Sequence, residues 1–138
     1  MQIVIQTLIR RVLAHKPLTL VSGGWPMTDY QEQLAECQAN NKNLFASVGE
    51  AGKGFGALHA ASVADGVLDT KTKELMLLSI SVVERCEGCI TQHTAACIKA
   101  GASREEFVEA ISVAIMMAGG PATVYGGKAL ACFDQLSK

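Results

Sequence analysis

The stretch Glu84–His93, ERCEGCITQH, holds residues that could do redox, metal-binding or nucleophilic chemistry. Cys86 and Cys89 are three positions apart, and His93 follows the second cysteine by four. Cysteine and histidine at this spacing can bind a metal ion, and a close cysteine pair can form a redox-active disulfide. A cysteine near a histidine can also be an activated thiolate nucleophile. The motif alone leaves these three kinds of chemistry open.

A helix that begins near Cys86 would place these side chains on one side, because residues three and four positions apart are neighbours on a helix. Cys97 continues the same line one turn further. Cys86 would lie at the helix N-terminus, where the positive end of the helix dipole and the free N–H groups favour a thiolate. Cys89 would have His93 near enough for direct or water-mediated proton exchange. Both features are ones that a nucleophilic cysteine needs.

Glu74 is a candidate partner for His93. If the segment before Cys86 is a helix antiparallel to the one after it, the turn between them lies near Arg85. Glu74 is then about 11 residues before the turn and His93 about 8 after it, so their depths along the helix pair differ by only about 4–5 Å. A carboxylate there can orient the imidazole and raise its basicity. The alternative is that Glu74, in the first turn of its predicted helix, only favours the helix dipole.

Other roles for the cysteines have less support. A structural zinc ion usually has four ligands, and the chain has no second CxxC or histidine pair at a suitable spacing. Cys97 could be a fourth ligand only with strained geometry on the same helix. Haem attachment needs a histidine directly after the second cysteine, and a thioredoxin-like site needs a preceding strand. We expect Cys37, Cys97 and Cys132 to be small buried hydrophobes, and His15 and His59 to be surface or core histidines.

The composition limits the classes of protein and partner. The chain has 138 residues, 49% hydrophobic and 18% charged, which is typical of one well-buried globular domain. Its net charge of −1 gives no electrostatic basis for binding nucleic acid or an anionic membrane. It has five cysteines, an odd number, and no recognisable secretory signal. We therefore expect a cytoplasmic protein rather than a disulfide-stapled extracellular one.

The N-terminal segment, residues 1–27, is predicted to be an extension of uncertain role that precedes a domain of residues 28–138. Its apolar residues are interrupted by charged ones, so it is too short and too charged to span a membrane. One interpretation is an amphipathic helix over about residues 2–14. The other is that translation begins at Met27 and the upstream residues have no role in the fold.

The rest of the chain is predicted to be a run of helices with short turns and no strand pair, which indicates an all-α bundle of about five to six helices. Thr28 or Asp29 can cap the first helix, Gly101 is a good helix stop, and Ser103 with Glu106 has the spacing of a capping box. A glycine-containing passage, residues 49–56, is expected to separate the first two helices. The expected helices are 29–40, 55–64, 70–85, 86–100, 103–118 and 121–135.

The residues Glu74, Cys86, Cys89 and His93 together match the pattern E-x11-C-x2-C-x3-H. In this the chain resembles the AhpD-like alkylhydroperoxidases, which belong to the carboxymuconolactone decarboxylase superfamily. Further similar segments are DTKTKELMLLSISV, the AGAS turn and GGPATVYGGKAL. The resemblance covers roughly residues 44–133, and the whole motif is far more specific than a CxxC pair.

The resemblance implies an all-α subunit that assembles into trimers or hexamers, contains no metal or haem, and has the CxxC pair at the N-terminus of a central helix. It implies that Cys89 attacks a hydroperoxide and becomes a sulfenic acid, and that Cys86 resolves this to a disulfide. Glu74 and His93 would relay the proton that activates Cys89. A dithiol, from a lipoyl-bearing or thioredoxin-like protein, would reduce the disulfide again.

One position departs from the best-known members of that family, which carry a histidine directly before the second cysteine, where this chain has Gly88. The proton relay would therefore be shorter. We predict a thiol-dependent peroxidase. The alternatives are a non-enzymatic redox sensor or interaction module, a related enzyme with another substrate, and a zinc-stabilised scaffold. Lactone decarboxylation itself is disfavoured, because decarboxylases of this superfamily generally lack the cysteine pair.

Overall fold

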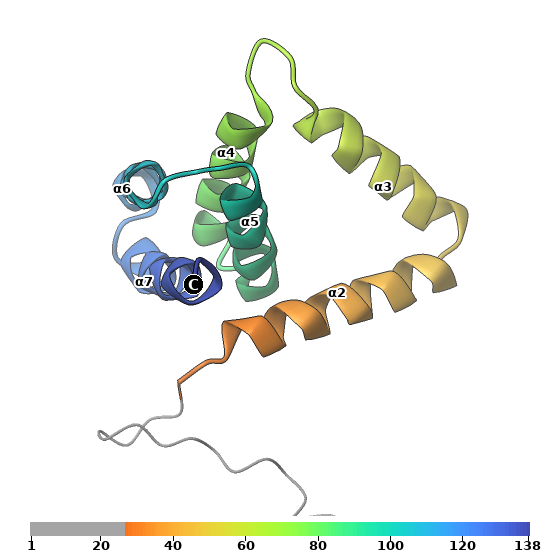
Figure 1. Cartoon of the computed structure of the whole chain (residues 1–138), viewed down its shortest axis with the longest axis horizontal. Coiled ribbons are helices and arrows are strands. Elements are labelled where there is room, and N and C mark those ends of the chain that lie inside the picture. The colour runs from red at the N-terminus through yellow and green to blue at the C-terminus, as the bar shows by residue number, and fades with distance from the viewer. Residues whose placement is uncertain (1–26) are drawn as a thin grey trace, which may run out of the picture.

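The computed structural model describes residues 27–138, and the predicted all-α fold is confirmed for them: they form helices and no strand (Figure 1). The suggested amphipathic helix near residues 2–14 lies outside the described residues. The helices are α2 (Tyr30–Ser47), α3 (Glu50–Val63), α4 (Thr70–Val83), α5 (Glu87–Lys99), α6 (Arg104–Ala118) and α7 (Gly120–Leu136).

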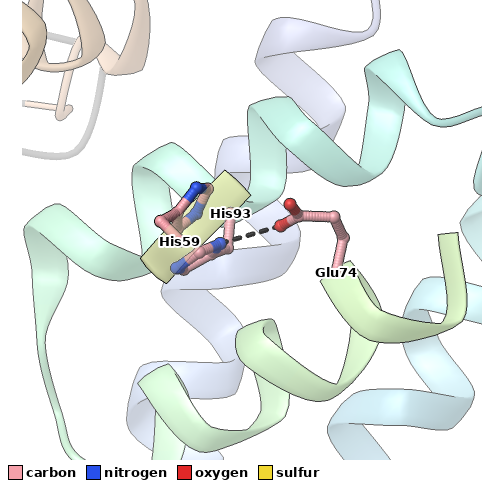
Figure 2. Close-up of side chains that lie close together, drawn as sticks. All are labelled: His59, Glu74 and His93. Atoms are coloured by element: carbon pink, nitrogen blue, oxygen red, sulfur yellow. Dashed lines mark hydrogen bonds and ion pairs between the residues drawn. The ribbon is translucent and has the colours of Figure 1, made fainter. Parts of the chain in front are cut away.

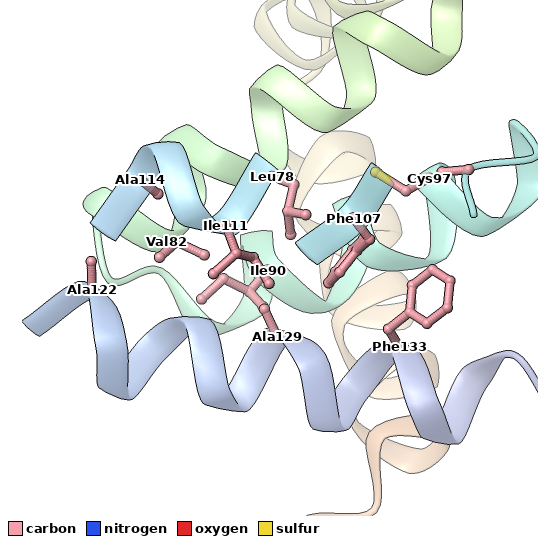
Figure 3. Close-up of a cluster of buried hydrophobic side chains, with 11 residues drawn as sticks. Leu78, Val82, Ile90, Cys97, Phe107, Ile111, Ala114, Ala122, Ala129 and Phe133 are labelled. Atoms are coloured by element: carbon pink, nitrogen blue, oxygen red, sulfur yellow. The ribbon is translucent and has the colours of Figure 1, made fainter. Parts of the chain in front are cut away.

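Four of these helices, α4 to α7, surround the hydrophobic core, and α4 packs most extensively against α5 and α6 (Figure 1). Phe107 and Phe133 lie at one end of the core with their ring centroids 4.7 Å apart. The core is completed by small and branched aliphatic side chains (Figure 3), namely Leu78, Val82, Ile90, Cys97, Ala102, Ile111, Ala114, Ala122 and Ala129. Burial of these side chains is what fixes α4 and α5 relative to each other.

The other two helices form an arm beside this bundle (Figure 1). α2 runs along α5 and α7, held by a hydrogen bond from Thr91 Oγ1 to Gln33 Oε1 at 2.9 Å and one from Asn41 Nδ2 to Gln92 Oε1 at 3.2 Å. α3 then returns toward α4 but stays exposed along nearly its whole length, with Gly52 as its one buried residue. The arm therefore has much less apolar burial than the bundle.

The predicted helix starts are confirmed where a side chain caps them. The Asp29 carboxylate accepts hydrogen bonds from the backbone N–H groups of Gln31 and Glu32, and Asp69 accepts one from Thr72. Ser103 and Glu106 form the expected capping box. Such caps satisfy N–H groups that have no partner inside the helix.

The predicted boundaries of the arm are wrong. α2 continues past Asn40 to Ser47, and α3 begins at Glu50 rather than near Phe55. The glycine-containing passage is therefore mostly helix. Gly52 has a physical reason to be glycine, since a Cβ there would lie 2.6 Å from the carbonyl oxygen of Phe45. The glycine allows the end of α2 and the start of α3 to approach closely.

None of the helices within residues 27–138 combines the length and the apolar composition that a membrane span requires.

Candidate functional site

The two cysteines of the motif lie at the start of α5, as predicted. Cys86 is the N-cap residue, and its Sγ accepts a hydrogen bond from the backbone N–H of Cys89 at 3.3 Å. The two residues form a disulfide with a Cα–Cα distance of 5.2 Å, which is the pairing that the family resemblance implies. Both are partly exposed. The cysteine pair therefore lies at the positive end of a helix dipole, an environment that stabilises a thiolate when the cysteines are reduced.

The turn between α4 and α5 fixes the position of Cys86. The N–H of Arg85 donates to the carbonyl of Val82, and the N–H of Cys86 donates to the carbonyl of Ser81. This is the hydrogen-bond pattern of a Schellman motif, which ends α4. Arg85 has a φ of +59°, in the left-handed region that glycine prefers. The last turn of α4 is thus joined directly to the first turn of α5.

Glu74 and His93 lie side by side across the two helices. His93 Nδ1 is 2.8 Å from Glu74 Oε2, and the side chains are only 18% and 5% exposed (Figure 2). Glu74 is the fifth residue of α4, so it lies beyond the first turn that the alternative interpretation required. A buried carboxylate is costly without a partner, and His93 is its hydrogen-bonding partner here. The antiparallel helix pair thus forms the expected carboxylate–imidazole pair.

Cys89 and His93 are four residues apart on α5, a spacing at which two side chains are neighbours on the helix surface. Glu74 holds His93 through Nδ1. That leaves Nε2, the other ring nitrogen, for exchanging a proton. The arrangement has the order thiol, imidazole, carboxylate, which is the order of a catalytic triad.

His59 is a neighbour that the sequence did not reveal. It is exposed, as expected, but α3 brings its ring to a centroid distance of 6.2 Å from that of His93, with 26° between the ring planes (Figure 2). An open pocket of about 260 Å³ lies here, lined by Gln38, His59, Glu74, Gln92, His93, Ala95, Ala96 and Lys99. No local sequence signal links His59 to the motif, because their proximity depends on the path of the chain between α3 and α4.

The remaining cysteines differ among themselves. Cys97 and Cys132 are fully buried, as predicted, and burial raises the pKa of their thiols to about 12 and about 11. Cys37 on α2 is only partly buried. Its sulfur lies 3.3 Å from where a Cβ on Gly88 would be. Gly88, the position at which the chain departs from the best-known AhpD-like proteins in the family resemblance, therefore has the sulfur of a cysteine of α2 close by.

Comparison with known proteins places the chain in a family. Residues 49–131 match the model of the carboxymuconolactone decarboxylase family. An uncharacterised protein of Cupriavidus necator is 33% identical over 110 residues, covering 80% of this chain and 97% of that protein. An uncharacterised protein of the cox locus of Paracoccus denitrificans is 39% identical over 82 residues, covering 59% of this chain and 74% of its own.

Solved structures agree with the family match. A carboxymuconolactone decarboxylase family protein from Legionella pneumophila has a TM-score of 0.76 and 34% identity, covering 79% of this chain and 97% of its own. A family protein from Thermotoga maritima, for which an antioxidative role has been suggested, has a TM-score of 0.69 and 33% identity, covering 75% and 89%. With a match of the family model to more than half of its residues, this chain belongs to the carboxymuconolactone decarboxylase family.

Proposed function

We propose that the protein is a thiol-dependent peroxidase that reduces hydroperoxides with the Cys86–Cys89 pair. The observation that carries the proposal is the 2.8 Å pair of Glu74 and His93, one helical turn from Cys89. A disulfide alone would need no such base. The suggested antioxidative role of the Thermotoga maritima relative supports the same class of reaction.

The first step is the attack of Cys89 on the peroxide. His93 takes the thiol proton of Cys89, and Glu74 stabilises the resulting imidazolium. The thiolate attacks one peroxide oxygen, so the O–O bond breaks and an S–O bond forms. Cys89 becomes a sulfenic acid, and the leaving alkoxide takes the proton from His93 to depart as an alcohol. The sulfur is oxidised and the peroxide is reduced by two electrons.

The second and third steps restore the enzyme. The Cys86 sulfur attacks the sulfenic acid of Cys89, which forms the disulfide and releases water. Cys86 is suited to this because the N-cap position favours its thiolate. An external dithiol then exchanges with the disulfide, which returns both cysteines to thiols and leaves the donor oxidised. A lipoyl-bearing or thioredoxin-like protein is the proposed donor.

The test is peroxide consumption with dihydrolipoamide as the donor, measured for hydrogen peroxide and for organic hydroperoxides. We expect turnover in the wild type and none in Cys89→Ser. Cys132→Ser is the matched control, because its thiol is buried and protonated. Equal turnover in the wild type and in Cys89→Ser would refute the proposal. A pair that is oxidised and reduced without consuming peroxide catalytically would instead favour a redox sensor.

We also propose that the protein is a homo-oligomer, a trimer or a hexamer. The support is a set of large apolar side chains that the single chain leaves in solvent on α4 and α6, among them Met76, Ile80, Val113, Met116 and Met117. An apolar surface of this kind is typical of a subunit interface.

A further inference from the structure

Three potential metal ligands from three different helices line the open pocket next to His93. His59 comes from α3, Glu74 from α4 and His93 from α5, and their side chains face one another (Figure 2). One ligand atom of each residue lies within 4.8 Å of the ligand atoms of the other two. Among the histidine, cysteine, aspartate and glutamate side chains of residues 27–138, these three are close enough together to hold one metal ion.

From this geometry we propose that His59, Glu74 and His93 form a binding site for a divalent transition-metal ion of the Zn²⁺ class, and that an ion bound there stops the proton relay. The binding site is independent of the reaction, whereas its inhibitory effect rests on the proposed peroxidase function. The site is separate from the cysteine-based zinc site considered from the sequence, and the family resemblance implied no metal at all.

The donor atoms decide the class of ion. Two imidazole nitrogens and one carboxylate oxygen are the ligands that Zn²⁺ and neighbouring first-row ions prefer, whereas Ca²⁺ and Mg²⁺ prefer oxygen ligands throughout. With three protein ligands, the fourth position faces the open pocket, which has room for water or a small anion. Lys99 is the cationic side chain among the lining residues, and it is exposed to solvent.

The distances require only a small adjustment. Ligand atoms around a tetrahedral Zn²⁺ are about 3.3 Å apart, given bonds of about 2.0–2.1 Å. Glu74 and His93, both largely buried, are already 2.8 Å apart. The widest separation of 4.8 Å therefore has to close by about 1.5 Å. His59 is the exposed member of the group, so rotation of its side chain can supply this movement.

An ion at this site would have two consequences. It would use the carboxylate oxygen of Glu74 and a nitrogen of His93, so neither could accept or pass the proton of Cys89. It would also connect α3 to the bundle, since α3 buries only Gly52 on its own. Because the three ligands come together only in the folded protein, an ion bound to them would stabilise the protein against unfolding.

Binding is tested on the oxidised protein, in which the disulfide keeps Cys86 and Cys89 from binding metal as thiolates. The background carries Cys37→Ser, which removes the partly exposed free thiol. Zn²⁺ is titrated against a chromophoric chelator. We expect one ion per chain, and an affinity at least tenfold weaker in His59→Ala than in the matched control Gln38→Ala, which removes a pocket side chain that is not one of the three ligands. Circular dichroism checks that each variant is folded.

Two results of this titration would overturn the site: no Zn²⁺ binding by the background protein, or the same affinity in His59→Ala as in Gln38→Ala. Co²⁺ gives a second readout, because its visible absorption spectrum reports the ligands. We expect a cobalt spectrum in the background protein that is lost in His59→Ala.

Inhibition is tested as peroxide turnover with and without Zn²⁺, each variant being compared with its own metal-free rate. We expect saturating Zn²⁺ to lower the rate at least tenfold, and His59→Ala to need at least ten times more Zn²⁺ for the same effect. If Zn²⁺ inhibited by binding the reduced cysteines instead, the protein with His59 and the His59→Ala variant would need the same Zn²⁺ concentration. That result would contradict inhibition through the three-ligand site. A protein that binds Zn²⁺ at His59 but has no metal-free turnover would refute the peroxidase function and the inhibitory role but leave the binding site intact.

Discussion

Glu74 determines the electrostatics of the candidate site at the scale of single residues. It is a carboxylate with 4% exposure whose partner is the imidazole of His93. A buried charge is costly without a partner, so Glu74 depends on His93 being next to it. In the proposed proton relay, Glu74 holds the imidazole of His93 through Nδ1, so that the other ring nitrogen can exchange a proton with Cys89.

Replacing Glu74 by glutamine tests this role. Glu74→Gln keeps the shape and a hydrogen bond to His93 but removes the negative charge that stabilises the imidazolium. We expect the rate of sulfenic acid formation to fall about 100-fold, which is the lower end of what a positioned acid–base group contributes. Stopped-flow peroxide reduction measures this. Glu109→Gln, an exposed carboxylate on α6, is the control, and an equal loss in both variants would contradict the relay.

The cysteines should differ in reactivity at mildly alkaline pH. Because burial raises the pKa of Cys97 and Cys132 to about 12 and about 11, these thiols stay protonated well above the pKa of a free cysteine. At pH 8 only about one in a thousand or fewer is a thiolate. In the reduced native protein we expect a thiol reagent to label Cys37, Cys86 and Cys89 quickly. Mass spectrometry locates the labels, and rapid labelling of Cys97 or Cys132 would contradict this.

At the scale of the helices, the sequence contains the information that positions Glu74 and His93. The two residues lie on consecutive helices joined by a short turn, so a rise per residue and an antiparallel arrangement suffice to bring them together. The caps at Asp29, Asp69 and Ser103 are equally local, because each depends on residues within one turn. Features decided by short-range geometry could therefore be predicted.

Substitutions at two helix ends with left-handed backbone conformations should change the free energy of unfolding in opposite directions. Arg85 has a φ of +59° in the turn before Cys86, and Gly101 has a φ of +79° after α5. A non-glycine residue in this region costs about 1–2 kcal/mol. We expect Arg85→Gly to raise the free energy of unfolding by about 0.5–1 kcal/mol, since glycine also gains entropy when unfolded. Gly101→Ala should lower it by about 1 kcal/mol, with no clash to explain the loss.

Urea denaturation of the oxidised protein measures both changes. Opposite signs are the result that supports the backbone argument. A loss of stability in Arg85→Gly would show instead that the arginine side chain contributes contacts that outweigh its conformational cost.

On the scale of the whole molecule, the position of His59 could not be predicted from the sequence. α3 is a separate, exposed helix, and its approach to α4 and α5 depends on the length of α2 and on the close contact of Gly52 with Phe45. The helix was predicted to start too late, because the glycines at positions 52, 54 and 56 were interpreted as a break. Packing of one helix against another decided both features: α3 against the end of α2 for the helix start, and α3 toward His93 of α5 for His59. No periodicity within α3 predicts such contacts.

From the exposed apolar side chains of α4 and α6 we expect the chain to form a homo-oligomer. An open apolar groove lined by Leu75, Met76, Ile80, Ala110 and Val113 lies between these helices. Light scattering should give the mass of a trimer or a hexamer, and Val113→Glu should lower it, because a buried unpaired charge destabilises an interface. Val67→Glu, in the exposed loop before α4, is the control. A monomeric wild type would contradict the proposal.

The central claim is that Cys89 attacks the peroxide and becomes the sulfenic acid. The variant Cys86→Ser tests this claim most directly, because it has no resolving thiol at position 86. The reduced variant is treated with one equivalent of an organic hydroperoxide, and the product is trapped with a sulfenic acid reagent and located by mass spectrometry. We expect one trapped sulfenic acid, located on the sulfur of Cys89, and one equivalent of alcohol per chain. Peroxide consumed with the oxygen on another residue, or no reaction at Cys89, would contradict it.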